Sequence, residues 1–284
     1  MFYIGCPAWG YKGWIGSLFP ERTPASEFLS LYSQKLTTVE GNTTFYATPS
    51  PETIARWVQE TPETFRFCPK VSRSISHSMN LDACKEESLE FIERMRGLGS
   101  RLGPMFLQLP PTFGIAQLPQ LERYLAFWPT DVRLAVEVRH SQFYEEDYAK
   151  TLDELLTHYH IARVMMDTRP IRTGSTKEQK TLQARERKPN LPLHIAATTD
   201  FVFVRYIGHP RLEVNAPFLD SWAKQMEQWL TQELTIYVFC HCPFEEFDPL
   251  LCTELYRRVN TLTPLPPLPL EVSGVSTIEQ GHLF

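Results

Sequence analysis

The chain lacks the features of a membrane protein and of a disulfide-stabilised secreted protein. No apolar run reaches the roughly 18 residues that a membrane-spanning helix needs, and Met1 leads directly into the strand-like run Phe2–Cys6. The six cysteines have neither the spacing of a disulfide framework nor the CxxC spacing of a zinc site. We therefore expect reduced thiols, a cytoplasmic location and no membrane partner.

An excess of positive charge is also absent. The 284 residues carry 28 Lys and Arg against 33 Asp and Glu, a formal charge of −5. Such a chain does not attract polyanions as a whole, so contact with phosphate or nucleic acid has to come from a local patch. Hydrophobic residues make up 43% of the chain, which is enough for a large core.

What the chain does have is a series of eight apolar runs of strand length, most of which end in a polar or charged residue. Helix-like segments, among them Pro51–Thr61 and Ala216–Trp229, separate most neighbouring runs. This alternation predicts a single (β/α)₈ TIM barrel. The carboxyl ends of the strands would then meet around one mouth. The runs are Phe2–Cys6, Thr37–Asn42, Phe65–Lys70, Met105–Leu109, Leu134–Arg139, Arg163–Asp167, Phe201–Arg205 and Ile236–His241.

Two segments depart from this regular alternation. Thr168–Asp200 is too long for an ordinary connection, so we expect a loop with some helix, and it holds seven basic residues between Thr168 and Asn190. These basic residues could bind an anion, or they could form only a solvent-exposed surface. A Pro-rich stretch begins at Thr263, so we divide the chain into a barrel domain (residues 1–262) and an extended C-terminal tail (263–284).

The densest motif is Val39-Glu40-Gly41-Asn42-Thr43-Thr44-Phe45-Tyr46, in which a strand gives way to a hydroxyl-rich turn with two aromatic residues. It resembles the signature of the YecE-like family, also called domain of unknown function 72. Further matches follow in the same order along about Met1 to Val259, among them Gln108-Leu109-Pro110-Pro111, Ala135-Val136-Glu137 and Arg139-His140.

This resemblance implies a barrel related to the xylose isomerase and endonuclease IV group, with no established activity. The chain departs from the family at its eighth run, where the usual paired Asn is replaced by His241-Cys242-Pro243-Phe244. A family role for that strand end is therefore not carried over.

Candidate catalytic residues lie at the ends of the fifth and sixth runs. Glu137 and Asp167 end consecutive strands, so we expect them to reach one substrate, and His140 could move protons near neutral pH. The alternative for these charged groups is a set of structural ion pairs in the mouth.

Candidate ligand-binding residues surround the same mouth. Lys70, Arg139 and Arg205 would neutralise a phosphate or carboxylate, and Gly208 would let the backbone approach it. Trp9 and Tyr46 could stack on a ring, with core packing as the alternative. The full set is Trp9, Glu40, Asn42, Tyr46, Lys70, His77, Gln108, Arg139, Arg205, Gly208 and His241.

We expect no required cofactor or metal. A single divalent ion held by Glu40, Glu137, Asp167 and a histidine is the alternative. A second alternative is a metal held by Cys240, His241 and Cys242 beside Cys6.

The last five residues, Gln280-Gly281-His282-Leu283-Phe284, resemble the Q-x-x-L-F peptide by which many bacterial replication and repair proteins dock on the DNA sliding clamp. Gln280, Leu283 and Phe284 are thus candidate partner-binding residues, with an ordinary frayed tail as the alternative.

Two classes of function follow, with an anionic small molecule or nucleic acid as the partner. The first is an enzyme acting on a phosphate-bearing ligand, for example by acid–base or metal-assisted hydrolysis. The second is a non-catalytic DNA-associated module that reaches the clamp through its tail. A small-sugar isomerase rests on fold analogy alone.

Overall fold

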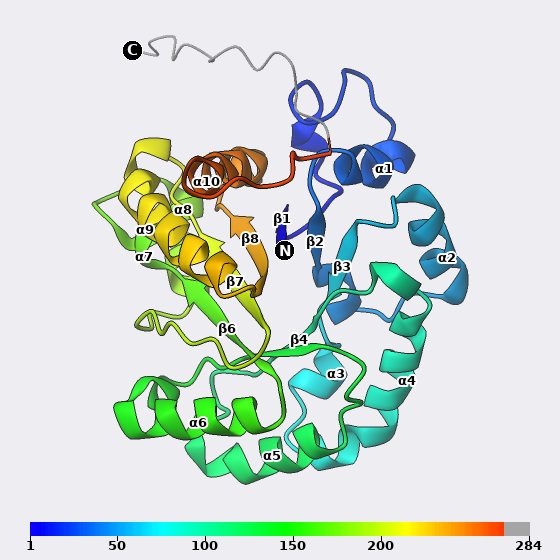
Figure 1. The fold of residues 1–284 in the computed structure, drawn as a ribbon, viewed down its shortest axis with the longest axis vertical. Helices are drawn as coiled ribbons and strands as arrows, with labels where there is room; N and C mark the ends of the chain where they lie inside the picture. Colours follow the sequence, from blue (N-terminus) through cyan, green and yellow to red (C-terminus); the bar gives the residue numbers. More distant parts are fainter. Residues whose placement is uncertain (270–284) are drawn as a thin grey trace.

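Eight parallel strands surround a central axis in the computed structural model, which describes residues 1–269 (Figure 1). The hydrogen-bonded order is β3-β2-β1-β8-β7-β6-β5-β4, and bridges from Phe67 to Leu102 and from Lys70 to Phe106 join β3 to β4 and close the barrel. The (β/α)₈ prediction is therefore confirmed. The strands are β1 (Phe2–Cys6), β2 (Thr38–Gly41), β3 (Arg66–Pro69), β4 (Met105–Gln108), β5 (Leu134–Glu137), β6 (Ala162–Asp167), β7 (Phe201–Ile207) and β8 (Thr235–His241).

Helices surround the strands, as Figure 1 shows. They are α1 (Phe28–Ser33), α2 (Pro51–Glu60), α3 (Arg73–Ser76), α4 (Lys85–Arg96), α5 (Leu118–Ala126), α6 (Glu146–His158), α7 (Arg169–Arg172), α8 (Gln179–Arg187), α9 (Leu212–Thr231) and α10 (Asp248–Leu262). Within residues 1–269, no helix combines the length and the apolar character needed to cross a bilayer.

Helix α9 begins earlier than the sequence predicts. A start at Ala216 would place Pro217 in the first turn, where its missing N–H costs nothing. The helix instead begins at Leu212 and contains Pro217. The Asn215 side chain donates to the carbonyl oxygens of His209 (2.8 Å) and Arg211 (3.0 Å), which ties the first turn of α9 to the loop after β7.

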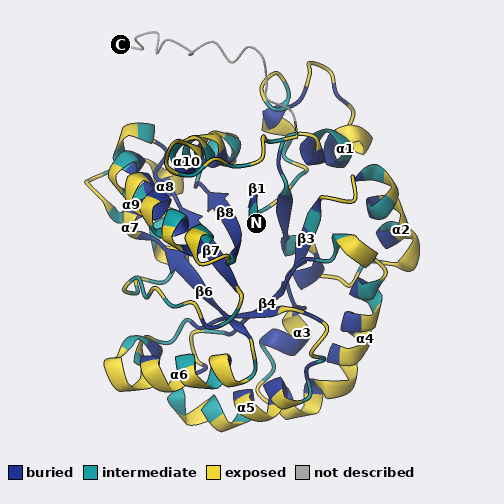
Figure 2. Ribbon diagram, in the orientation of Figure 1, coloured by how far each residue is buried: buried dark blue, intermediate teal, exposed yellow. Residues whose placement is uncertain are grey.

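The strands are buried on both faces, as expected for a parallel barrel (Figure 2). Alternate residues of each strand point to opposite sides. One set packs against the helices in the main hydrophobic core. The other set fills the barrel interior below the mouth and includes Tyr3, Phe106, Phe203, Tyr237 and Phe239.

The long connection after β6 contains helices α7 and α8, as predicted. Several of its basic side chains hold the connection itself together. Arg172 donates to the carbonyl oxygens of Arg185 (2.9 Å) and Lys188 (2.7 Å), while Arg169 pairs with Asp167 at 2.8 Å. Only part of this basic segment is thus left for a ligand.

The Pro-rich stretch begins against the barrel rather than away from it. The Tyr256 hydroxyl donates to the carbonyl of Pro266 at 2.8 Å, and Leu265 and Leu268 pack on the main core. The proposed clamp-binding residues Gln280, Leu283 and Phe284 lie outside the described residues, so their role stays a prediction.

Candidate functional site

The centre of the barrel mouth is a buried ion network built on Arg205 of β7. Arg205 donates to both carboxylate oxygens of Glu40 on β2, through Nε at 2.7 Å and Nη2 at 2.8 Å. Its Nη1 donates to Glu137 Oε2 on β5 at 2.5 Å. These three side chains are at most 3% exposed, so one guanidinium connects three separate strands inside the barrel.

Strand alternation explains why these particular residues meet. On β7, Arg205 lies two residues after Phe203, which points into the barrel interior. Glu137 follows Ala135 of the same interior set at the same spacing. On β5 and β7 the charged inward-facing residue therefore lies directly above the apolar interior.

Further hydrogen bonds extend the network to β3 and β4. Arg139 donates through Nε to Glu137 Oε1 (2.6 Å) and through Nη2 to Gln108 Oε1 (2.8 Å). The Lys70 ammonium donates to the same Gln108 oxygen at 2.9 Å. Lys70 thus has a neutral amide as its partner, and it takes part in none of the ion pairs among residues 1–269.

The motif after β2 positions Lys70. The Thr44 hydroxyl lies within hydrogen-bonding distance of the carbonyl oxygens of Gly41 (2.8 Å) and Lys70 (2.6 Å), which joins this turn to the end of β3. The turn places the Phe45 ring 4.1 Å from Lys70 Nζ, a cation–π contact. Asn42 donates to Glu40 (2.7 Å) and to the carbonyl of Pro7 (3.0 Å).

Burial and the neighbouring charges together lower the pKa values of four groups in this network. Burial alone would raise the pKa of Glu40 and Glu137. Arg205 acting together with His241 at Glu40, and with Arg139 and Lys70 at Glu137, outweighs burial, and the pKa of Glu137 falls to about 2. Burial and then Arg205 lower the pKa of Lys70 to about 8. Burial lowers the pKa of His241 to about 4, although Glu40 favours its charged form.

His241 should therefore make stability depend on pH in a defined window. A folded-state pKa of about 4, below the ordinary 6.5, means that the unfolded chain binds the proton first as the pH falls. Stability should decrease by about 2 kcal/mol between pH 7 and pH 5 through this residue alone. Urea unfolding of wild type and His241→Gln at both pH values measures it, and equal losses in the two proteins would contradict it.

Two neighbouring cavities open above the network. The first, here called the inner chamber, has a volume of about 390 Å³. It is lined by Asn42, Phe45, Tyr46, Lys70, Arg73, His77, Gln108, Arg139, Lys188, Arg205 and His241.

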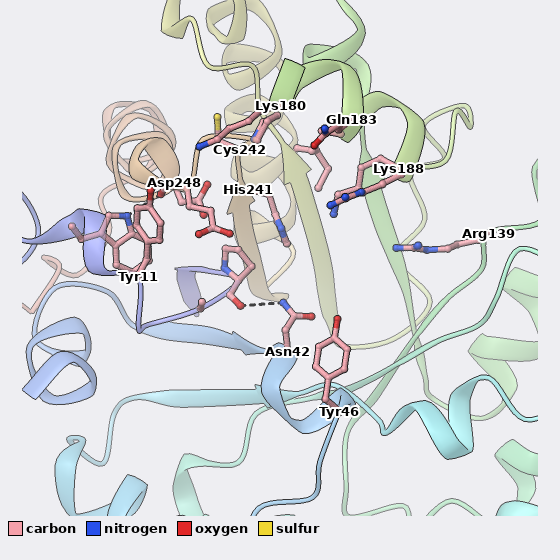
Figure 3. A pocket seen from close by; sticks show the side chains of 18 residues that line it. Tyr11, Asn42, Tyr46, Arg139, Lys180, Gln183, Lys188, His241, Cys242 and Asp248 are labelled. Atoms are coloured by element: carbon pink, nitrogen blue, oxygen red, sulfur yellow. Dashed lines mark hydrogen bonds between the residues drawn. The ribbon is translucent and has the colours of Figure 1, made fainter. Parts of the chain in front are cut away.

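The second cavity, here called the outer chamber, has a volume of about 750 Å³ and is shown in Figure 3. It shares five wall residues with the inner chamber: Asn42, Tyr46, Arg139, Lys188 and His241. The rest of its wall comes from Pro7, Ala8, Tyr11, Trp14, Lys180, Gln183, Ala184, Arg187, Ile207, Cys242, Pro243, Glu245 and Asp248.

Most of the predicted ligand-binding residues meet at these chambers. The predicted catalytic residue Asp167 does not. Asp167 lies on the outward face of β6, where it accepts hydrogen bonds from Trp222 Nε1 of α9 (2.8 Å) and from Arg169. Val164 and Met166 point to the inner face of β6, and side chains alternate along a strand, so Asp167 points to the opposite face. The expected pair of Glu137 and Asp167 therefore does not form.

Three further predicted residues have structural contacts instead. His140 caps a short 3₁₀ helix through Nδ1, which accepts from the Gln142 N–H at 3.3 Å. Trp9 packs against Trp57 and Phe67, with ring centroids 5.2 and 6.2 Å apart. The third residue is Gly208. His140, Trp9 and Gly208 are all absent from the walls of both chambers.

Gly208 is required for packing and not for an anion. A Cβ at this position would lie 2.6 Å from Leu251 Cδ1 and 2.9 Å from Asn215 Oδ1. Its N–H donates to the carbonyl of His241 at 2.7 Å, so it is not available to a ligand.

Neither of the two alternative metal-ligand sets comes together. Cys6 and Cys240 lie in the outer core against α10, with Cys6 Sγ 3.7 Å from Cys252 Sγ, whereas His241 faces the chambers. Glu40 and Glu137 are held by arginines and Asp167 faces away. Within the described part of the chain, no group of three or more His, Cys, Asp or Glu is arranged to hold a metal ion.

Sequence reasoning gave no site role to several residues of these walls, among them Lys188 and Asp248. Lys188 is one of seven basic residues in the connection after β6, and no local pattern distinguishes the one that reaches the mouth. Asp248 resembles an ordinary acidic residue in the first turn of a helix.

Comparison with known proteins places this fold and sequence in a recognised group. A family model described as "Protein of unknown function DUF72" matches residues 3–271. The chain is 34% identical to the protein YecE of Escherichia coli K12, over the full length of both, and 27% identical to YunF of Bacillus subtilis over 54% of this chain and 56% of that protein.

Solved structures show the same fold. A DUF72 family protein of Enterococcus faecalis aligns with a TM-score of 0.68 at 20% identity, covering 94% of this chain and 98% of that one. One from Thermotoga maritima aligns with a TM-score of 0.66 at 22% identity, covering 92% and 99%.

Proposed function

Because this chain belongs to the DUF72 family of proteins of unknown function, its activity has to be argued from the site, and we propose that it binds a phosphate-bearing small molecule at the barrel mouth. The observation that carries the proposal is the surplus of cations in the inner chamber. Lys70, Arg139, Lys188 and Arg205 line it, while its network contains two carboxylates.

The surplus is concentrated on two lysines. Neither Lys70 nor Lys188 forms an ion pair with any residue in the range 1–269. Burial, followed by the charge of Arg205, lowers the pKa of Lys188 to about 8, as it does for Lys70. Lys70 is buried and Lys188 is half-buried. A desolvated cation without a counter-ion is costly, and a bound dianion would supply the missing charge.

Binding is better supported than acid–base catalysis. Glu137, with a pKa of about 2 and two arginine partners, is a poor proton acceptor near neutral pH. Asp167 and His140 lie away from the chambers. The cationic side chains, by contrast, come from several strands and from the segment after α8, and this arrangement suits a compact anion.

Removing the Lys188 charge tests the proposal. Lys188→Gln should weaken binding of inorganic phosphate, measured by isothermal titration calorimetry at pH 7, by about 10- to 100-fold, the value of one charge-assisted hydrogen bond.

The matched control is Lys224→Gln. Lys224 is exposed on α9 and lies outside both chambers, so this substitution removes the same charge without touching the site. Equal phosphate affinity in the two variants, or no binding by the wild type, would refute the proposed function.

A further inference from the structure

The outer chamber is larger than a phosphate ion requires. Ligand sites typically measure about 300–1,000 Å³, and the two chambers measure about 390 and 750 Å³. Lys188 and Arg139 belong to both walls, so an anion held between them would leave the outer chamber for the rest of a ligand. The chemistry of that remainder can be inferred from the outer wall.

Charge changes sign across the outer chamber. Lys180 and Arg187 of α8 form one side, together with Lys188, whereas the carboxylate of Glu245 lies on the other side, in the short segment before α10. Figure 3 shows Lys180 and Lys188 beside α8 and Asp248 on the α10 side. A chain of phosphates would meet like charge at the second side, so the ligand should carry its anion at one end.

Asp248 has an unusual environment for an acidic residue. It is 1% exposed, and its Oδ1 has no hydrogen-bond partner among residues 1–269. Burial, followed by the neighbouring Cys252, raises its pKa well above the ordinary value. A neutral carboxyl group on a chamber wall is both a hydrogen-bond donor and an acceptor, which matches a hydroxyl group.

Asn42 offers a complementary group on the wall that both chambers share. Its amide nitrogen donates to Pro7 and Glu40, which uses both N–H donors. The amide oxygen is left as an acceptor for a ligand hydroxyl.

Trp14 and Tyr11, the two aromatic side chains of the outer wall that lie outside the shared part, do not offer a stacking platform for a nucleobase. Trp14 is 1% exposed, its Nε1 donates to the carbonyl of Glu245 at 2.8 Å, and its ring stacks on Tyr32. The Tyr11 ring packs edge-on to Trp14 with centroids 5.7 Å apart. On the side of the chamber next to Glu245 and Asp248, hydroxyl recognition therefore fits better than base recognition.

Resting on the proposed phosphate site, we propose that the outer chamber binds the hydroxyl-bearing part of a sugar phosphate, with Asp248 and Asn42 hydrogen-bonded to its hydroxyl groups. The phosphate lies between Lys188 and Arg139, and the sugar extends toward the start of α10. The unpartnered oxygen of Asp248 gains its missing partner when the sugar binds.

Calorimetry on the full-length protein tests this, with ribose 5-phosphate, inorganic phosphate and adenosine monophosphate as probes. Ribose 5-phosphate should bind about tenfold or more tightly than inorganic phosphate, because two further hydrogen bonds form. Asp248→Ala should abolish that advantage and leave inorganic phosphate affinity unchanged. Asp248→Asn should retain it, because the amide still donates.

The outcomes separate the two proposals. If inorganic phosphate binds through Lys188 but ribose 5-phosphate binds no more tightly, the sugar assignment fails and the phosphate site stands. Absence of binding by both refutes both. Tighter binding of adenosine monophosphate than of ribose 5-phosphate also overturns the sugar assignment. Should Asp248→Ala fail to fold, the sugar assignment is still tested by the affinities of the wild type and of Asp248→Asn for ribose 5-phosphate and inorganic phosphate.

Discussion

Replacing Arg205 with methionine is expected to lower the free energy of unfolding by about 3–5 kcal/mol, the usual cost of removing one partner from a buried ion network. Arg205 is 2% exposed and supplies three hydrogen bonds to two carboxylates that are themselves buried. Without it, Glu40 and Glu137 would repel each other at the centre of the barrel, and their pKa values would rise. Chemical denaturation at pH 7 measures the loss.

Two controls define what this loss means. Arg123→Met breaks the exposed pair with Asp82, in which both side chains are at least 37% exposed, and should change stability little. The triple variant Arg205→Met, Glu40→Gln, Glu137→Gln also removes the two unpaired carboxylates. It should regain much of the lost free energy of unfolding. A small effect of Arg205→Met, comparable with that of Arg123→Met, would contradict the network described here.

The second large effect concerns anion affinity and pH. Lys70 and Lys188 both have a pKa of about 8, and a bound dianion favours their charged forms. As the pH rises from 7 to 9, the free protein loses these charges, so affinity should fall by about tenfold for each lysine that contacts the anion. Sulfate is the appropriate probe, since its own charge is constant over this range.

Lys188→Arg is the informative variant for this experiment. Arginine stays charged up to pH 9, so the variant should bind sulfate at pH 9 with a smaller loss than the wild type. Calorimetry at pH 7, 8 and 9 would show it, and sulfate binding at pH 8 should be accompanied by proton uptake. A pH-independent affinity in the wild type would mean that neither lysine contacts the anion.

The same two lysines also affect stability in the absence of a ligand. Their folded-state pKa of about 8 lies below the ordinary 10.5, so the unfolded chain binds more protons between these values. Their contribution to stability therefore increases as the pH rises from about 8 toward 10.5. Anion binding opposes this trend, which couples the occupancy of the site to the stability of the barrel.

Strand and helix content followed from local patterns, which is why the barrel was predictable. Each apolar run and each helical period reflects which residues have to be buried, and this constraint acts within a few residues. The predicted helix Pro51–Thr61 thus corresponds to α2 (Pro51–Glu60). The start of α9 was predicted less well because Asn215 and its contacts with the preceding loop set that boundary.

For the site, the sequence by itself determined that Glu40, Glu137, Arg205 and His241 stand near the carboxyl ends of their strands, and a closed parallel barrel brings such residues together. Only the tertiary structure decided which face each side chain takes and which distant segments complete the walls. Successive side chains of a strand point to opposite faces of the sheet. Asp167 takes the outward face of β6, where it accepts a hydrogen bond from Trp222. Lys188 reaches the chambers through the folding of the long connection after β6, and Asp248 through the loop between β8 and α10, and no short-range pattern encodes either placement.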